Sequence, residues 1–223
     1  MRLFIPSVSF AISVLLSFHS QAQNETLLID DIQNSPPLAV QDILQNEIKP
    51  LARSSDLIKA IRQQNVANIG LNQKQIIALD QKWRQETEKL DHPFIDQLLN
   101  NAASKQLQLL KNNKNGLITE IIVTDNKGLN VAISDITSDY WQGDEDKWQK
   151  TLPVGPDAVF ISDPDIDQST QQFQIQISVT ITDPENHKGI GSLTVGIDLD
   201  LLGLYLEEGG EEARLNNMDI PNE

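Results

Sequence analysis

The residues best suited to chemistry gather at positions 135–148, which read DITSDYWQGDEDKW. This stretch contains one of the two Tyr and two of the three Trp in the chain, set among carboxylates. Aromatic faces attract cations, and carboxylates accept charge-assisted hydrogen bonds from amines. The stretch therefore predicts a site for a small cationic or amine-bearing ligand, formed by Asp139, Tyr140, Trp141, Asp146 and Trp148. The alternative is that the aromatics fix a loop to the domain while the acids face water.

Asp198 is the sixth candidate for ligand binding. It lies near the end of the last predicted strand, where a carboxylate can reach over the mouth of a sheet. The alternative is that Asp198 and Asp200 cap a short helix predicted at residues 201–206.

The residues that most other kinds of catalytic or metal site require are absent from the sequence or stand in unsuitable contexts. The chain has no cysteine, which excludes thiolate zinc sites and cysteine nucleophiles. His92 and His187 lie in polar, turn-like contexts, and residues 163–169 lack the glycine and distal glutamate of a calcium loop. We expect no catalytic residue, no metal and no cofactor, with an unusual hydrolase as a remaining alternative. A net charge of −15 argues against nucleic acid as a partner.

The N-terminal residues predict that the protein is exported from the cytoplasm. Residues 1–22 have Arg2, an apolar run and a small residue at positions 20 and 22, as in a cleaved signal peptide. We therefore expect a periplasmic protein; the alternative, a retained anchor, conflicts with the shortness of the apolar run. Residues 23–37 read as a flexible leader, and residues 207–223 as an acidic disordered tail.

Between the ends, apolar spacing predicts helices first and strands second. The helical part covers residues 38–115, with a kink or stop at Pro50, caps at Ser55 and Asn72, and one last helix from Pro93 to about residue 112. The sheet part covers residues 116–206, with strands at 117–124, 129–134, 158–161, 172–182 and 190–199 and a short helix at 144–151.

The strand at residues 172–182 alternates without exception, which predicts one core face and one polar face. The predicted core face consists of Phe173, Ile175, Ile177, Val179 and Ile181. The fold class is therefore α+β, with long N-terminal helices packed on a five-stranded antiparallel sheet of two hairpins and a crossover.

Several segments resemble the Cache (PDC) family of extracellular sensor domains. TEIIVTDNKGLNVA (119–132) is similar to their first hairpin, TSDYWQGDEDKW (137–148) to the loop and helix after it, and GIGSLTVGID (189–198) to their final strand. AIRQQN (60–65) and LDQKWR (79–84) resemble an exported, stand-alone subgroup. The resemblance covers about residues 40–202. It implies a long N-terminal helix on a PAS-like sheet, with a small-molecule pocket between sheet and loops.

The resemblance also implies roles for individual residues. In the amino-acid-sensing branch, an Arg two residues before a Trp holds the ligand carboxylate, and an Asp on the last strand holds its amine. Trp148 and Asp198 match the Trp and the Asp, whereas Asp146 occupies the Arg position, where Lys147 could partly substitute. The match thus favours an amine or quaternary cation over an α-amino acid.

The predicted function is a periplasmic, non-catalytic sensor that binds a small ligand in residues 38–206. The family implies a membrane-bound receptor or histidine kinase as partner, and pairing of two copies as a homodimer. The alternative is a ligand-free interaction module that docks on the extracellular domain of a membrane sensor.

Overall fold

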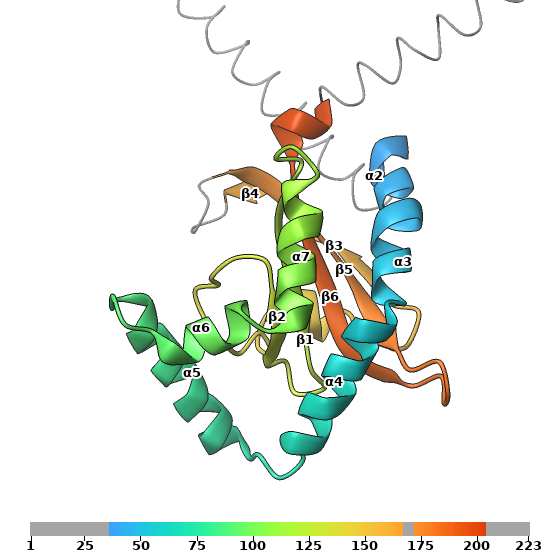
Figure 1. Ribbon diagram of the computed structural model, residues 1–223. Coiled ribbons are helices and arrows are strands. Elements are labelled where there is room, and N and C mark those ends of the chain that lie inside the picture. Colours follow the sequence, from blue (N-terminus) through green and yellow to red (C-terminus); the bar gives the residue numbers. More distant parts are fainter. Residues whose placement is uncertain (1–35, 167–171, 204–223) are drawn as a thin grey trace, which may run out of the picture. The chain divides into compact units, whose positions relative to one another are not determined.

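The computed structural model describes residues 36–166 and 172–203, so the predicted signal peptide and acidic tail lie outside the described residues. Within the described residues, the chain from Leu38 onward forms one compact unit. Its helical part has these elements: α2 (Leu38–Ile43), the π-helical η1 (Leu44–Ile48), α3 (Lys49–Ala52), α4 (Ser55–Ala67), α5 (Gln73–Thr87), α6 (Pro93–Leu99) and α7 (Ala102–Asn112). Figure 1 shows these helices around a central sheet.

Pro50 does not end the first helix, where the sequence predicts that the helix kinks or stops. The chain stays helical from Leu38 to Ala52, and the segment directly before Lys49 and Pro50 widens into the π-helical η1. A proline lacks the backbone N–H of a regular helical bond and crowds the preceding turn. A local π-helical turn accommodates this loss without a break.

The predicted helix starts are partly confirmed. Asn72 forms a capping box with Gln75 at the start of α5, as its side chain predicts. The N-cap of α4 is Ser54 rather than Ser55. The single helix predicted from Pro93 is two helices, because Asn101 leaves the helical conformation and accepts a hydrogen bond from the Ser104 N–H as the cap of α7.

The sheet is antiparallel, in the order β2-β1-β6-β5-β3. Its strands are β1 (Ile118–Thr124), β2 (Asn130–Ile133), β3 (Val159–Ile161), β5 (Phe173–Thr182) and β6 (Gly189–Asp198), and α8 (Asp146–Gln149) lies in the connection between β2 and β3. A sixth short strand, β4 (Asp165–Ile166), pairs with β5 where only a turn was predicted. The predicted α+β class, with two hairpins and a crossover that brings β6 beside β1, is confirmed.

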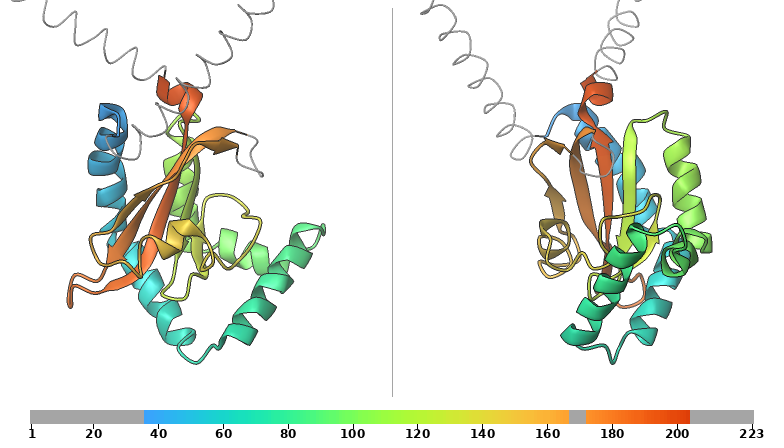
Figure 2. Two further views of the ribbon diagram at one scale, coloured as in Figure 1. Left: turned by 180° about the vertical axis from the view of Figure 1, so that it is seen from behind. Right: turned by 90° about the vertical axis from the view of Figure 1, so that its left-hand side faces the viewer.

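The two faces of the sheet are covered by different elements. Figure 2 shows the N-terminal helices on one side and the loops around α8 on the other. The apolar face of β5 is buried at Ile175, Ile177, Val179 and Ile181, as predicted, but Phe173 is 45% exposed. The opposite face is polar yet also buried. Its buried side chains are Glu120, Thr124, Gln174, Ser178, Thr180, Ser192, Thr194 and Asp198.

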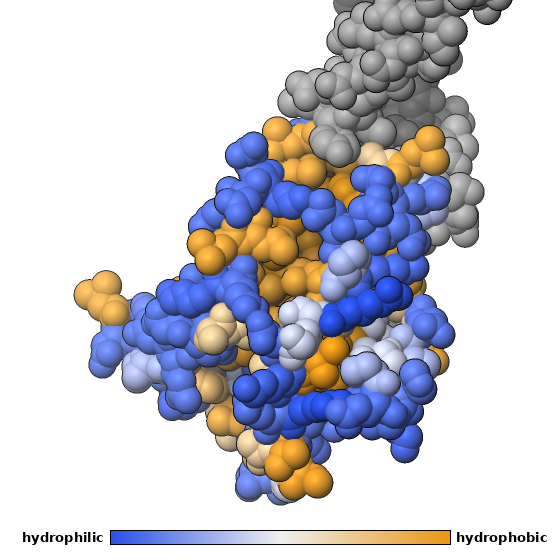
Figure 3. All heavy atoms as spheres, turned by 45° about the vertical axis from the view of Figure 1, so that its right-hand side comes forward, coloured by the Kyte–Doolittle hydropathy of each residue, from blue (hydrophilic) through white to orange (hydrophobic). Residues whose placement is uncertain are grey.

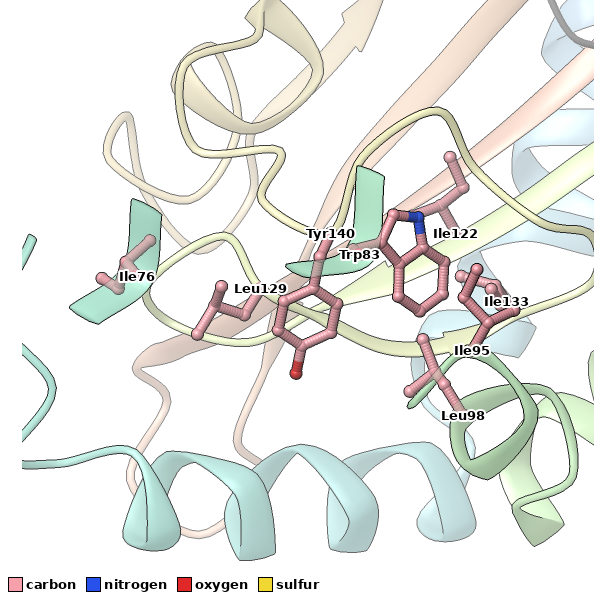
Figure 4. Packing of buried hydrophobic residues seen from close by; sticks show 8 residues of the cluster. All are labelled: Ile76, Trp83, Ile95, Leu98, Ile122, Leu129, Ile133 and Tyr140. Atoms are coloured by element: carbon pink, nitrogen blue, oxygen red, sulfur yellow. The ribbon is translucent and has the colours of Figure 1, made fainter. Parts of the chain in front are cut away.

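A second core lies beside the β1–β2 hairpin. The indole of Trp83 is fully buried there, stacked on Tyr140 with ring centroids 5.6 Å apart and edge-on to Phe94 at 5.6 Å. Figure 4 shows the Trp83 and Tyr140 rings side by side, with Ile122 and Ile133 of the hairpin and Ile95 and Leu98 of α6 near the indole. Trp83 thus belongs to the core between helices and sheet, as its position in the helical pattern predicts.

An ion pair fastens the β5–β6 turn to α4. Arg62 donates to both carboxylate oxygens of Asp183, Nη2 to Oδ1 at 2.6 Å and Nε to Oδ2 at 2.8 Å, and Nη1 donates to Glu185. The hydrogen bonds from Arg62, followed by the backbone N–H of Glu185, hold the pKa of Asp183 below its ordinary value.

We expect the Arg62–Asp183 ion pair to make the free energy of unfolding decrease at low pH. Because the pKa of Asp183 is lower in the folded than in the unfolded state (about 3.9), its contribution is present above that value and lost as the pH falls through the folded pKa. Thermal unfolding followed by circular dichroism should show a steeper acid loss for the wild type than for Asp183→Asn. The exposed Asp200→Asn should follow the wild type. Parallel curves for all three proteins would contradict this role.

Candidate functional site

Asp80 on α5 holds the aromatic loop of residues 135–148. Its Oδ1 accepts the backbone N–H groups of Tyr140 at 2.9 Å and Trp141 at 3.0 Å, and its Oδ2 accepts Nε of Arg84 at 2.7 Å. The loop and a helix more than fifty residues earlier are thus joined by one buried carboxylate. Sequence reasoning missed Asp80, although its position on the same side of α5 as Ile76 and Trp83 was a usable signal. The sequence carries no local sign of its partner, the backbone of residues 140 and 141.

Asp139 extends this network. Its Oδ2 accepts Nη2 of Arg84 at 2.9 Å, and its Oδ1 accepts the side-chain amide of Gln142 at 2.6 Å. Burial, and then the nearby carboxylate of Glu145, raise the pKa of Asp139, while Arg84 and Gln142 oppose the shift. Asp139 therefore has partners within the protein and serves to order the loop.

Tyr140 and Trp141 point into the protein from this loop. The Tyr140 ring belongs to the core with Trp83, and burial raises the pKa of its phenol. In Figure 4 its hydroxyl points toward the turquoise helix α4. There Tyr140 forms part of the wall of a groove of about 680 Å³ between α4 and α7, together with amide side chains such as Gln64 and Asn101.

The Trp141 indole is half-buried against the β1–β2 turn. Its Nε1 donates to the carbonyl of Lys127 at 2.8 Å. A Cβ on Gly143 would collide with this indole, and one on Gly128, whose φ is +81°, would collide with the backbone of Gly143. Two glycines thus allow the loop to lie directly on the turn.

The turn itself carries a fully buried carboxylate, Asp125. It accepts the backbone N–H groups of Lys127 at 2.8 Å and Leu129 at 3.0 Å, and side-chain amides of Gln64 and Asn68 on α4. The structure shows that this turn also attaches α4 to the hairpin.

Trp148, Asp146 and Lys147 lie on α8, which packs against β5 and β6. The Trp148 indole reaches the carbonyl of Asp125 at 3.4 Å. Asp146 is exposed and pairs with Lys150 at 2.8 Å. Lys147 is turned inward, with its side chain only 11% exposed, and pairs with Glu145 at 2.8 Å.

Asp198 lies at the other end of the same face of the sheet. Its Oδ1 accepts the Leu201 N–H at 2.9 Å, which is the capping contact given above as the alternative to ligand binding, and its Oδ2 accepts the Gln172 amide at 3.0 Å. Ser192, six residues earlier on β6, pairs with Thr124 beside Asp125. Six strand residues span roughly 20 Å. The structure therefore does not bring Asp198 and the indole nitrogen of Trp148 together.

Glu120 is a buried neighbour of Asp198 on the sheet, and sequence reasoning missed it. It pairs with Gly196 on β6, and Gly196 pairs with Gln176 on β5, so Glu120 points to the same face as Asp198 in the adjacent row. Its Oε1 accepts the amides of Gln174 at 3.1 Å and Gln176 at 2.7 Å. A glutamate inside an apolar strand was a usable signal, because strands rarely bury a charge without a reason.

The buried acids on this face have amide and backbone partners. Within residues 36–166 and 172–203, no basic side chain pairs with Glu120 or Asp198, no group of three metal-ligating side chains occurs, and no helix has the length and hydrophobicity to cross a membrane. The face can therefore supply negative charge and hydrogen-bond acceptors to a ligand.

Comparison with known proteins gives similarity in structure only. No family model and no curated protein matches the sequence. The fold is similar to the sensor domain of the Vibrio cholerae histidine kinase DctB, at 12% identity and TM-score 0.46, over 86% of this chain and 59% of that one.

Two chemoreceptor domains with bound ligands are also similar. One is the Campylobacter jejuni Tlp3 domain with L-norvaline, at 19% identity and TM-score 0.38 over 69% of this chain and 60% of that one. The other is the Pseudomonas aeruginosa PctC domain with GABA, at 13% identity and TM-score 0.40 over 84% and 64%. This chain spans less than two thirds of each of these structures, and at such identities the similarity concerns the fold alone.

Proposed function

We propose that this chain, which has the fold of a Cache-type sensor domain, is a periplasmic protein that binds a small amine-bearing or cationic ligand without catalysis. It would signal through a membrane-bound receptor or histidine kinase. The observation that supports this proposal best is the pair of buried carboxylates, Glu120 and Asp198, on one face of the sheet without a basic partner among the described residues.

The negative charge of the two buried carboxylates favours an amine as the ligand. A carboxylate taken out of water is costly unless a cation or several hydrogen bonds compensate it. Glu120 receives two neutral amide donors through one oxygen, and Asp198 receives one amide and one backbone N–H. A ligand ammonium between them would provide the missing charge and shorter, stronger hydrogen bonds.

The six predicted residues divide into three groups in this proposal. Asp198, together with Glu120, would bind the ligand amine. Asp139, Tyr140 and Trp141 position the loop through Asp80 and Arg84. Trp148 and Asp146, on α8 at the opposite end of the face, would contact the ligand only if it extends toward α8.

The test is a thermal-shift screen of the purified protein against amines, amino acids, carboxylates and divalent cations. A ligand at one hundred times its dissociation constant should add about 2.7 kcal/mol to the free energy of unfolding. We expect an amine to bind, and Glu120→Gln or Asp198→Asn to weaken it at least about tenfold, or about 1.4 kcal/mol.

The exposed Asp200→Asn removes the same charge near the same strand end and should leave the affinity unchanged. Amine affinity unaffected by both Glu120→Gln and Asp198→Asn would exclude the proposed contact.

The interaction module remains the second candidate, favoured by exposed hydrophobic side chains around α5. Val66 is 73%, Ile69 81% and Leu90 104% exposed. Figure 3 shows hydrophobic side chains standing out from a mainly hydrophilic surface. Trp141 does not decide between the two candidates, because it is half-buried and bonded to Lys127. A silent ligand screen on folded protein would favour this candidate.

A further inference from the structure

The groove between α4 and α7 has a volume of about 680 Å³, which is typical of small-molecule sites. Both helices pack against β2, on the side of the sheet that the N-terminal helices cover in Figure 2. Glu120 and Asp198 lie on the other face of the sheet. The groove is therefore separate from the proposed amine site.

The hydroxyl of Tyr140 forms the buried end of this groove. Tyr140 is only 6% exposed, and its ring is fixed by stacking on Trp83 and by an edge contact with Phe94 at 4.8 Å. Figure 4 shows the hydroxyl directed toward α4, and no residue within 36–166 and 172–203 forms a hydrogen bond with it. A buried tyrosine hydroxyl usually has a partner, and the groove is the side from which one can reach it.

Two amide side chains in the wall have a fixed orientation. The amide nitrogen of Gln64 donates to Oδ2 of Asp125 and to the carbonyl of Asn130, both at 3.1 Å, and that of Asn68 donates to the same Oδ2 at 2.8 Å. Because Asp125 is a fully buried carboxylate, it holds both NH₂ groups toward the protein. Their carbonyl oxygens accept no hydrogen bond from the described residues and remain for a ligand.

The groove carries no net charge, although the chain has a net charge of −15. Its described lining contains one acid, Asp56, and one base, Lys59, which cancel. Asp56 also accepts the side-chain amide of Gln106 at 2.9 Å. A strongly charged ligand would find no counter-charge here, so the lining favours a neutral one.

The remaining lining is apolar and small. It consists of the methyl groups of four alanines and one valine: Ala60, Ala67, Ala102, Ala103 and Val131. Short side chains keep the space between the two helices open and offer a surface for the C–H groups of a ligand.

We propose that this groove binds a neutral polyhydroxylated molecule, a sugar or a polyol. A hydroxyl group both donates and accepts hydrogen bonds. It can therefore accept from the Tyr140 hydroxyl and donate to the carbonyl oxygens of Gln64 and Asn68, which an anion cannot do. A cation would leave the Tyr140 proton without an acceptor and would meet Lys59.

Isothermal titration with glucose, maltose and sorbitol tests the proposal and separates ring sugars from an open-chain polyol. A binding signal is needed rather than a melting temperature, because such solutes also stabilise proteins by exclusion from their surface. We expect saturable binding of at least one probe. Tyr140→Phe should weaken it about three- to tenfold, the range for one neutral hydrogen bond. The melting temperature of the ligand-free variant should not fall, because the ring stays in the core and the hydroxyl has no partner among the described residues.

Ala67→Leu gives a second readout, because leucine fills part of the groove and is also a good helix former. It should weaken binding more than tenfold, whereas Ala78→Leu, the same change at an exposed position on α5, should not. Amine binding should persist in Ala67→Leu, which separates this site from the Glu120–Asp198 site.

No saturable binding of any probe, or equal affinity in wild type, Tyr140→Phe and Ala67→Leu, would overturn the proposal. A wild-type dimer that Ala67→Leu dissociates in sedimentation would also overturn it, because a second copy of the chain would then fill the groove.

Discussion

Trp83→Ala is expected to lower the free energy of unfolding by about 3–5 kcal/mol. The indole is fully buried, stacks on Tyr140, meets Phe94 edge-on, and donates from Nε1 to the Thr137 carbonyl at 2.8 Å. Its loss leaves a cavity between α5, α6 and the hairpin and an unsatisfied buried carbonyl. A domain of this kind has a total stability of about 5–15 kcal/mol, so the variant should be close to unfolding.

Urea unfolding of two further variants separates the causes. Trp83→Phe keeps an aromatic ring and removes the hydrogen bond, so its loss should lie between wild type and Trp83→Ala. Leu90→Ala removes a hydrophobic side chain that is 104% exposed and should change stability by no more than about 0.5 kcal/mol. Equal stability of Trp83→Ala and Leu90→Ala would show that Trp83 is not a core residue.

Asp80→Ala is expected to cost about 2–4 kcal/mol and to release the aromatic loop. It removes the acceptor of two backbone N–H groups, of which that of Tyr140 is buried, and it breaks the contact with Arg84. Arg84 is half-exposed and remains paired with Asp139, so the backbone contacts account for most of the loss.

Asp80→Asn is the matched control, because its amide oxygen can still accept both N–H groups. It should retain more than half of the stability lost in Asp80→Ala. Hydrogen exchange of the Tyr140 and Trp141 amides should speed up in the alanine variant and stay near the wild-type rate in the asparagine variant. If the two variants unfold and exchange alike, the carboxylate acts through Arg84 and not through the loop backbone.

The loop at residues 135–148 shows how far sequence reasoning reached toward the site. Sequence reasoning treated the aromatic and acidic side chains of this loop as one cluster. In the structure, Tyr140 turns toward Trp83 on α5, whereas Trp141 and Trp148 both reach the β1–β2 turn, at the carbonyls of Lys127 and Asp125. Neighbours in sequence separate when successive side chains of a loop pack against different elements.

Local patterns in the sequence determined the elements of this protein. The 3.6-residue spacing of apolar side chains predicts the helices, and the alternation in β5 predicts a strand, because these periods follow directly from backbone geometry. The capping box at Asn72 depends on contacts within one turn, and so it could also be predicted.

Only the tertiary structure decided which charges meet. Asp80 and Tyr140 are sixty residues apart in the sequence, Arg62 and Asp183 are 121 apart, and Glu120 joins Asp198 only through the register of β1 on β6. A carboxylate has the same local sequence pattern whether it faces water, a backbone N–H or a ligand. Its partner is fixed only when long-range strand pairing and helix packing bring distant segments together, so local sequence patterns could not identify it.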